Sequence, residues 1–196
     1  SDLPMRRIMS RTLTALLLAA AMGTPLRADD TVDSGAYLAA RVAEAENDFR
    51  AAATWYGKAM IADSGNPQLL DGAILAEIGI GDVALATEAA KLRKALPGDP
   101  SQLAEMALMA DEAKREDYAA LLAAIDGGRD VGELTNMLVA AWAWVGEGKM
   151  SEAVEAFDAV TTKKGFEAFG YYHKALALAS VGDFEGADEI LSGRAA

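Results

Sequence analysis

A short turn recurs five times along the chain at a nearly constant interval. Each copy has a polar or glycine residue, then a charged residue, then an apolar one, and successive copies lie 34, 35, 32 and 34 residues apart. The copies are Asn47-Asp48-Phe49, Gly81-Asp82-Val83, Glu116-Asp117-Tyr118, Gly148-Lys149-Met150 and Gly182-Asp183-Phe184. An interval of this length is typical of paired helices that stack into an array, and such arrays bind other molecules.

Residue size also repeats with this interval. Five positions after the first turn residue, four copies have alanine and the third has Leu121. Seven positions before the first turn residue, three copies have alanine, whereas the second has Ile74 and the third has Met109. Nine positions after it, four copies carry a large residue: Tyr56, Ile125, Phe157 and Leu191. Antiparallel helices come within about 8–10 Å only where small side chains lie at their closest contact. The pattern therefore predicts ten short helices in five packed pairs.

The repeated positions resemble the tetratricopeptide repeat (TPR) family over about residues 33–192. In the first unit the small and aromatic positions of the family are occupied by Ala36, Ala40, Phe49, Ala52, Tyr56 and Ala59. The resemblance implies an all-α fold, a right-handed α-solenoid of about five stacked helix-turn-helix units. We place the units at about residues 33–66, 67–101, 102–133, 134–167 and 168–196.

The resemblance also implies a binding groove lined by the first helix of each unit. A protein partner would place a peptide segment or a helix in this groove. The groove residues that we expect are Tyr37, Arg41, Asp71, Met106, Leu138, Trp142, Phe169 and Tyr172. The alternative for the aromatic members is that Trp142 and Phe169 only pack against neighbouring units, since aromatic residues at helical spacing are often core residues.

The first 28 residues differ from the repeats. Arg6, Arg7 and Arg11 precede an apolar run over residues 13–22, and a small residue, Ala28, follows. A ten-residue run is too short to cross a bilayer, which takes about 20 residues. We expect a secretory signal peptide that is cleaved near Ala28, leaving an exported, periplasmic chain 29–196 without a membrane span. The alternative is a retained first helix or a short anchor.

The charge of the chain excludes several classes of partner. The net charge is −12 and there is no cysteine. Residues 1–28 hold four basic and one acidic side chain, so residues 29–196 hold 14 basic and 29 acidic ones, a net charge of −15. Such a chain is repelled by nucleic acid and by anionic lipid headgroups. Its stability must come from stacked helix faces, because no disulfide can form.

No pattern in the sequence predicts catalysis. His173 is the only histidine, and we expect a structural or surface role for it. The acidic residues are expected on solvated helix faces, with no acid–base pair, and we predict no metal site and no cofactor. We therefore expect a non-enzymatic interaction scaffold of the bacterial cell envelope. The alternatives are a structural spacer within a longer TPR protein and a helical domain of a cell-wall or carbohydrate-active enzyme.

The end of the last unit lacks the polar capping helix that usually closes a repeat array. Residues 192–196 read Ser-Gly-Arg-Ala-Ala after the last apolar positions. We expect either that the natural array continues beyond this point or that the uncapped C-terminal unit self-associates.

Overall fold

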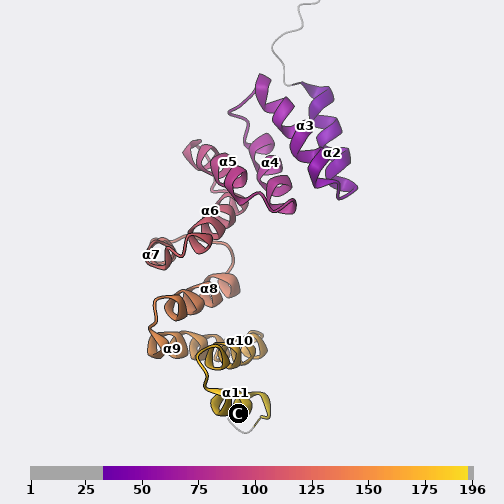
Figure 1. Ribbon diagram of the computed structural model, residues 1–196. Coiled ribbons are helices and arrows are strands. Elements are labelled where there is room, and N and C mark those ends of the chain that lie inside the picture. Colours follow the sequence, from indigo (N-terminus) through magenta and orange to yellow (C-terminus); the bar gives the residue numbers. More distant parts are fainter. Residues whose placement is uncertain (1–32, 194–196) are drawn as a thin grey trace, which may run out of the picture. The chain divides into compact units, whose positions relative to one another are not determined.

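The computed structural model describes residues 33–193, and the expected signal peptide lies outside the described residues. Within this range the chain forms ten helices in five pairs and no strand (Figure 1), which confirms the all-α prediction. The solenoid's handedness stays a prediction. The pairs are α2 (Ser34–Ala45) with α3 (Phe49–Ala62), α4 (Pro67–Gly79) with α5 (Val83–Ala95), α6 (Gln102–Lys114) with α7 (Tyr118–Asp126), α8 (Glu133–Gly146) with α9 (Met150–Thr161), and α10 (Glu167–Ser180) with α11 (Phe184–Leu191).

The recurring turn ends the first helix of each pair. Its first residue has a positive φ in all five copies, from 57° at Glu116 to 89° at Gly182. In the first copy Asp48 N–H donates to the carbonyl of Ala43 at 2.8 Å and Asn47 N–H to that of Glu44 at 3.0 Å, and the other copies repeat this pair of bonds. These two bonds define a Schellman motif, which satisfies the last free carbonyls of the helix.

The second residue of the turn starts the next helix. The carboxylates of Asp48, Asp82, Asp117 and Asp183 each accept a hydrogen bond from the backbone N–H three residues later, at 2.9–3.2 Å. A cap of this kind stabilises a helix by about 1 kcal/mol. Lys149 holds the same place before α9 and makes no side-chain cap. Each turn is therefore a stop signal and, in four copies, a start signal as well.

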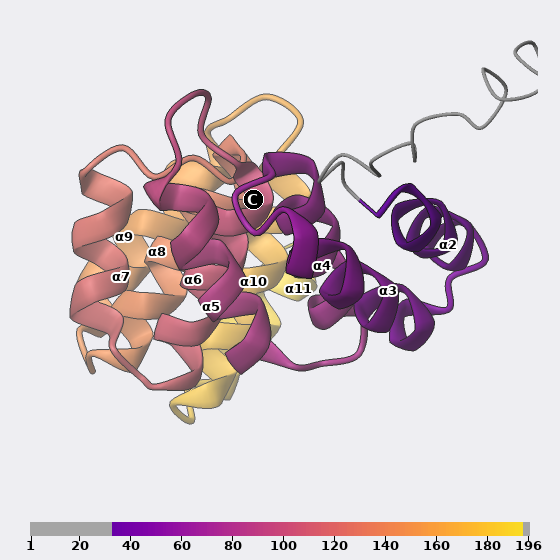
Figure 2. The same cartoon turned by 90° about the horizontal axis from the view of Figure 1, so that it is seen from above.

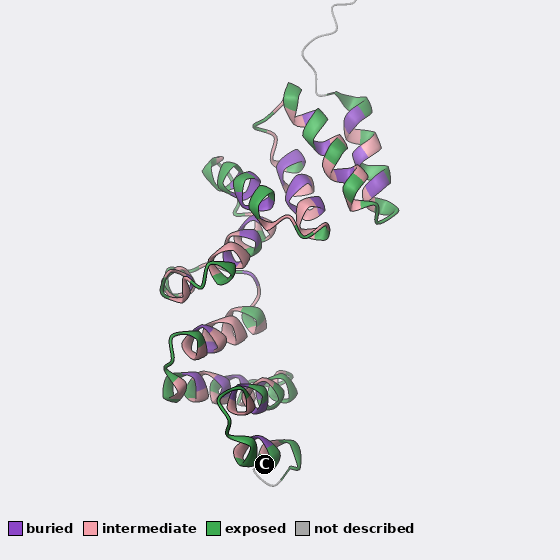
Figure 3. Ribbon diagram, viewed as in Figure 1, coloured by how far each residue is buried: buried purple, intermediate pink, exposed green. Residues whose placement is uncertain are grey.

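Each helix packs against the next one along the chain (Figures 1 and 2). In addition, α4 contacts α6, and α8 contacts α10. The predicted contact positions are buried in every pair, and Figure 3 shows the buried residues as stripes along the helices. Of the four large residues nine positions after the turn, Tyr56 and Phe157 are buried and Ile125 is partly buried. The expectation was wrong for Leu191, which is exposed because only α10 packs closely on α11 among the described residues.

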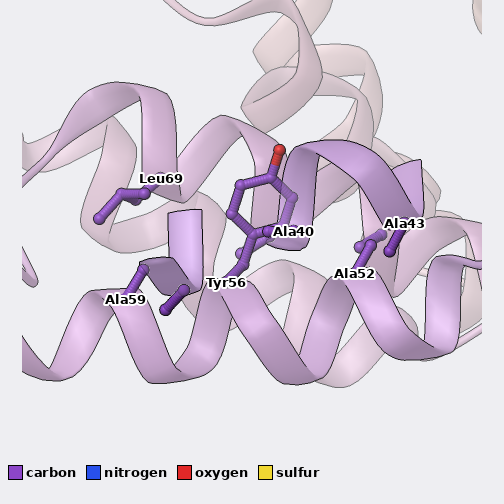
Figure 4. Close-up of a cluster of buried hydrophobic side chains, with 9 residues drawn as sticks. Ala40, Ala43, Ala52, Tyr56, Ala59 and Leu69 are labelled. Atoms are coloured by element: carbon purple, nitrogen blue, oxygen red, sulfur yellow. The ribbon is translucent and has the colours of Figure 1, made fainter. Parts of the chain in front are cut away.

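Tyr56 fills the core between the first two units (Figure 4). Its ring lies among Ala40, Ala52 and Leu69, from three different helices. Its hydroxyl donates to the carboxylate of Glu44, and burial together with this bond raises the pKa of Tyr56 to about 12. Gly72 makes room for the ring: a Cβ at this position would lie 2.2 Å from the Tyr56 Cζ. The first interface thus depends on an aromatic residue placed over a glycine.

The third pair is packed less closely than the others. Met109 on α6 and Leu121 on α7 are both buried, at the two positions where the first, fourth and fifth pairs have alanine. The distance between two helix axes depends on the side chains at their contact, so two large residues hold α6 and α7 apart. The irregular middle of the repeat pattern is therefore a structural feature of the array.

A buried ion cluster fixes the connection from α7 to α8, against the expectation that acidic side chains lie on solvated faces. Arg129 donates to Glu105 at 2.9 Å and, through two nitrogens, to Glu112, while Lys94 pairs with Glu105 at 2.8 Å. The side chains of Arg129, Glu105 and Glu112 are only 6%, 13% and 14% exposed. Glu105 and Glu112 on α6 can be buried because Arg129, in the loop before α8, pairs with both carboxylates.

Candidate functional site

An apolar cavity of about 490 Å³ lies between α6, α7, α8 and α10. Its wall carries no acidic or basic side chain apart from one imidazole. The lining residues are Ala113, Tyr118, Leu121, Leu134, Thr135, Leu138, Val139, Trp142, Ala143, Phe169 and His173. Cavities of about 300–1,000 Å³ with apolar walls and a few polar groups are typical of binding sites.

The loose third pair explains the position of this cavity. Leu121, one of the two large residues that separate α6 from α7, forms part of its wall. Tyr118 also lines it and packs against α8 at Gly146, where a Cβ would lie 2.5 Å from the ring. On α8, Leu134, Leu138 and Val139 line the cavity and are only partly buried. The cavity thus occurs where the repeat is least regular.

Trp142 forms a fixed part of the cavity wall. Its ring contacts Phe157 edge-on at 5.7 Å between centroids and His173 at 6.2 Å. Its indole Nε1 donates a hydrogen bond to His173 Nδ1 at 3.1 Å. Aromatic rings prefer such edge-to-face contacts, and the hydrogen bond adds a direction. Trp142 therefore packs between units and lines the cavity at the same time.

A second, polar cavity of about 320 Å³ lies near the other end of the array, between α2, α3, α4 and α6. It is lined by Tyr37, Arg41, Glu44, Tyr56, Gln68, Asp71, Gly72, Leu75 and Leu103. Its charged groups are already paired within the protein. Arg41 donates to Glu44 at 3.0 Å, and Asp71 accepts from Arg93 at 3.3 Å and from the Ser101 hydroxyl at 2.5 Å.

The eight expected groove residues fall into three groups. Tyr37, Arg41 and Asp71 line the polar cavity, whereas Leu138, Trp142 and Phe169 line the apolar one. Met106 and Tyr172 line neither; both are exposed, and the Tyr172 ring touches that of His173 at 5.4 Å between centroids. The structure thus gathers six of the expected residues at two separate cavities. A role of any of them in binding stays a prediction.

Sequence reasoning named only three of the eleven residues that line the apolar cavity. Tyr118 and Leu121 belong to a second helix, whereas the expected groove used first helices only. His173 was expected to be a structural or surface residue, and it is half-buried in the cavity wall. The substitution of large residues for alanine at Met109 and Leu121 was the signal that could have located the cavity.

Comparison with known proteins shows the fold. No family model matches the chain, and no curated protein matches its sequence. Two crystal structures of MamA are similar, each with 20% sequence identity, at TM-scores of 0.62 and 0.64; they cover 78% and 81% of this chain and 90% and 87% of their own. A crystal structure of YrrB, described as a TPR protein with an unusual peptide-binding site, has a TM-score of 0.59 and 20% identity, covering 78% of this chain and 79% of its own. The chain therefore has a TPR-like helical repeat fold.

Two further observations concern residues 33–193 alone. Every helix there is too short or too polar to traverse a lipid bilayer. In the same part of the chain, no three carboxylate or imidazole side chains gather closely enough to hold a metal ion.

Proposed function

We propose that this chain is a non-catalytic protein–protein interaction scaffold of the bacterial cell envelope. It binds a peptide segment or a helix of its partner through the face that carries the apolar cavity. The observation that supports the proposal is this cavity, lined by Leu138, Trp142 and Phe169 from the expected groove. Burial of an apolar side chain of the partner in such a pocket supplies binding free energy at the centre of an interface.

The chemistry of the cavity favours binding over catalysis. A hydrolytic site for carbohydrate needs two carboxyl groups that face each other across the substrate. The cavity wall contains no carboxyl group, and Glu105 and Glu112 are both bound to Arg129. The TPR-like fold and the described peptide-binding site of YrrB are consistent with a peptide ligand.

The test is selection of peptides from a displayed random library on the purified chain, followed by affinity measurement with two matched variants. Phe169 lies in the cavity wall and is 49% exposed, so Phe169→Ser changes the site without emptying the core. Phe184 is 71% exposed on α11 and lines neither cavity, which makes Phe184→Ser the control. We expect Phe169→Ser to weaken the selected peptides at least tenfold and Phe184→Ser to leave them unchanged. Equal effects of the two variants would refute the proposed site.

The envelope location is a separate part of the proposal, supported by the basic and apolar pattern of residues 1–28. Fusing residues 1–40 to a phosphatase that is active only after export would test it in a bacterial host. We expect phosphatase activity, and its loss when the apolar run is interrupted by two arginines. An inactive fusion that is made at normal levels would contradict the location and leave the binding site untouched.

A further inference from the structure

We propose that the apolar cavity receives a tyrosine side chain of the partner, and that His173 is the residue that distinguishes tyrosine from phenylalanine. This inference rests on the proposed function, because it names the residue that enters the proposed site. It follows from the hydrogen bond of one ring nitrogen of His173 and from the chemistry of the surrounding wall.

The hydrogen bond to Trp142 determines which nitrogen of His173 carries the proton. An indole N–H can only donate. Since Trp142 Nε1 lies 3.1 Å from His173 Nδ1, that nitrogen must accept and has no proton. A neutral imidazole carries its single proton on the other nitrogen. The neutral His173 ring therefore has an N–H donor at Nε2.

This donor is available to a ligand. The structure gives Nε2 no hydrogen-bond partner within residues 33–193, and the residue forms part of the cavity wall. Among the described residues, Glu77 Oε2 is the only buried side-chain polar atom without a hydrogen-bond partner. Since Nε2 has no partner either, it is not a buried atom. Its N–H is accordingly reachable from the cavity or from solvent. A well-placed donor in a mostly apolar site fixes the orientation of whatever binds there.

The rest of the wall matches an aromatic ring. Three of the lining side chains are the rings of Tyr118, Trp142 and Phe169, which favour edge-to-face contacts with a further ring. No acidic, lysine or arginine side chain lines the cavity, so a charged group would lose its hydration without gaining a partner. A phenol combines the ring that fits this wall with an oxygen that accepts from Nε2.

Two hydroxyl groups also belong to the wall, those of Tyr118 and Thr135. A hydroxyl both donates and accepts, so it does not select an acceptor over a donor. The Nε2–H group only donates. The proposal therefore predicts a preference for ligands with an acceptor oxygen, including 4-methylanisole, which has an acceptor and no donor.

Binding of p-cresol, 4-methylanisole and toluene to the purified full chain, measured by titration calorimetry, tests the proposal. We expect p-cresol and 4-methylanisole to bind about threefold to tenfold more tightly than toluene, the ratio that one net hydrogen bond produces. In His173→Leu this preference disappears while toluene still binds. In Trp142→Phe the hydrogen bond that selects the tautomer is absent, and the preference becomes smaller. Tyr171→Phe, on the same helix and outside the cavity wall, is the control and keeps the wild-type ratios.

The possible results separate this inference from the proposed function. Equal affinities of the wild type for all three compounds, or a preference that persists in His173→Leu, overturn the role of His173 and leave the apolar site in place. Failure of all three to bind a chain with full helical circular dichroism overturns the site, and the proposed tyrosine with it.

Discussion

Replacing Arg129 with methionine removes the cation from the buried ion cluster between α6 and the loop before α8. The side chain is only 6% exposed and pairs with Glu105 and Glu112, which are themselves mostly buried. Removing one partner of a buried pair costs about 3–5 kcal/mol, because the remaining charge is left without compensation. Glu105 keeps Lys94 at 2.8 Å, so the orphaned carboxylate is chiefly that of Glu112. We therefore expect a loss near the lower end, about 3 kcal/mol.

Thermal unfolding of the purified chain, followed by calorimetry, measures this loss. For a chain of this size about 3 kcal/mol corresponds to a fall in Tm of roughly 6–12 °C. Arg115→Met is the control: its side chain is 55% exposed and pairs with Asp111 and Asp117, a pair of the kind that contributes at most about 1 kcal/mol. Adding Glu112→Gln to Arg129→Met should recover part of the loss. Equal falls in Tm for Arg129→Met and Arg115→Met would refute the reasoning.

The pH dependence provides a second readout of the same cluster. Burial by itself raises the pKa of Glu105, but the hydrogen bonds from Lys94 and Arg129 outweigh it and lower the pKa below its usual value. A group with a lowered pKa in the folded state contributes stability above its unfolded pKa, and this stability is lost as the pH falls through the folded pKa. The part of the Tm difference between wild type and Arg129→Met that comes from the Arg129–Glu105 hydrogen bond should therefore be full at pH 7 and shrink in acid.

Three further changes test other features of the fold by the same thermal assay. Glu116 has a φ of 57° at the end of α6, so Glu116→Gly should raise stability by about 1 kcal/mol; no gain would mean that the turn is not left-handed. Gly72→Ala places a Cβ against the ring of Tyr56 and should lower stability by about 1–3 kcal/mol. Gly57 has open space around it, so Gly57→Ala should be neutral or stabilising. A larger loss of stability in Gly57→Ala than in Gly72→Ala would contradict the close packing of Tyr56 on Gly72. Burial raises the pKa of Glu77, so this carboxyl group binds more protons in the folded state than in the unfolded state. Stability therefore falls as the pH rises from the usual carboxyl pKa through the raised one. Glu77→Gln should flatten this dependence of Tm on pH, and an unchanged profile would assign the dependence to other groups.

The fold could be predicted from the sequence because its determinants are local. Four of the five turns carry glycine or asparagine, which suit a left-handed backbone, and four carry an aspartate that caps the next helix. Such signals act within six residues, so they can be found without knowledge of the neighbours in space. The buried alanines follow the same interval, since the closest contact of two helices recurs once in each pair. The turn in the middle of each pair and the small residues at its contact followed from these two patterns.

The candidate site was predicted only in part. Leu138, Trp142 and Phe169 were expected from their place on first helices, and they do line one cavity. Tyr118 and His173 were not expected there, because Tyr118 lies on a second helix and the place of His173 depends on how α10 packs against α8. A one-dimensional interval carries no measure of that packing. The same reason explains why the partner of Arg129 could not be named: Glu112 lies 17 residues away in sequence.

The amino-acid sequence alone predicts that this chain folds as paired helices, where the first helix of each pair ends and the second begins, and which small residues pack inside each pair. It could do so because caps, left-handed turns and small contact residues act over a few positions and repeat in every unit. The arrangement of the helices in space was needed to show that Leu121 lies in the wall of a cavity beside the loosely packed third pair, and that Trp142 donates to His173 Nδ1 and so leaves the imidazole proton on Nε2. These features arise where side chains from different units meet, and such contacts depend on the spacing of the helices.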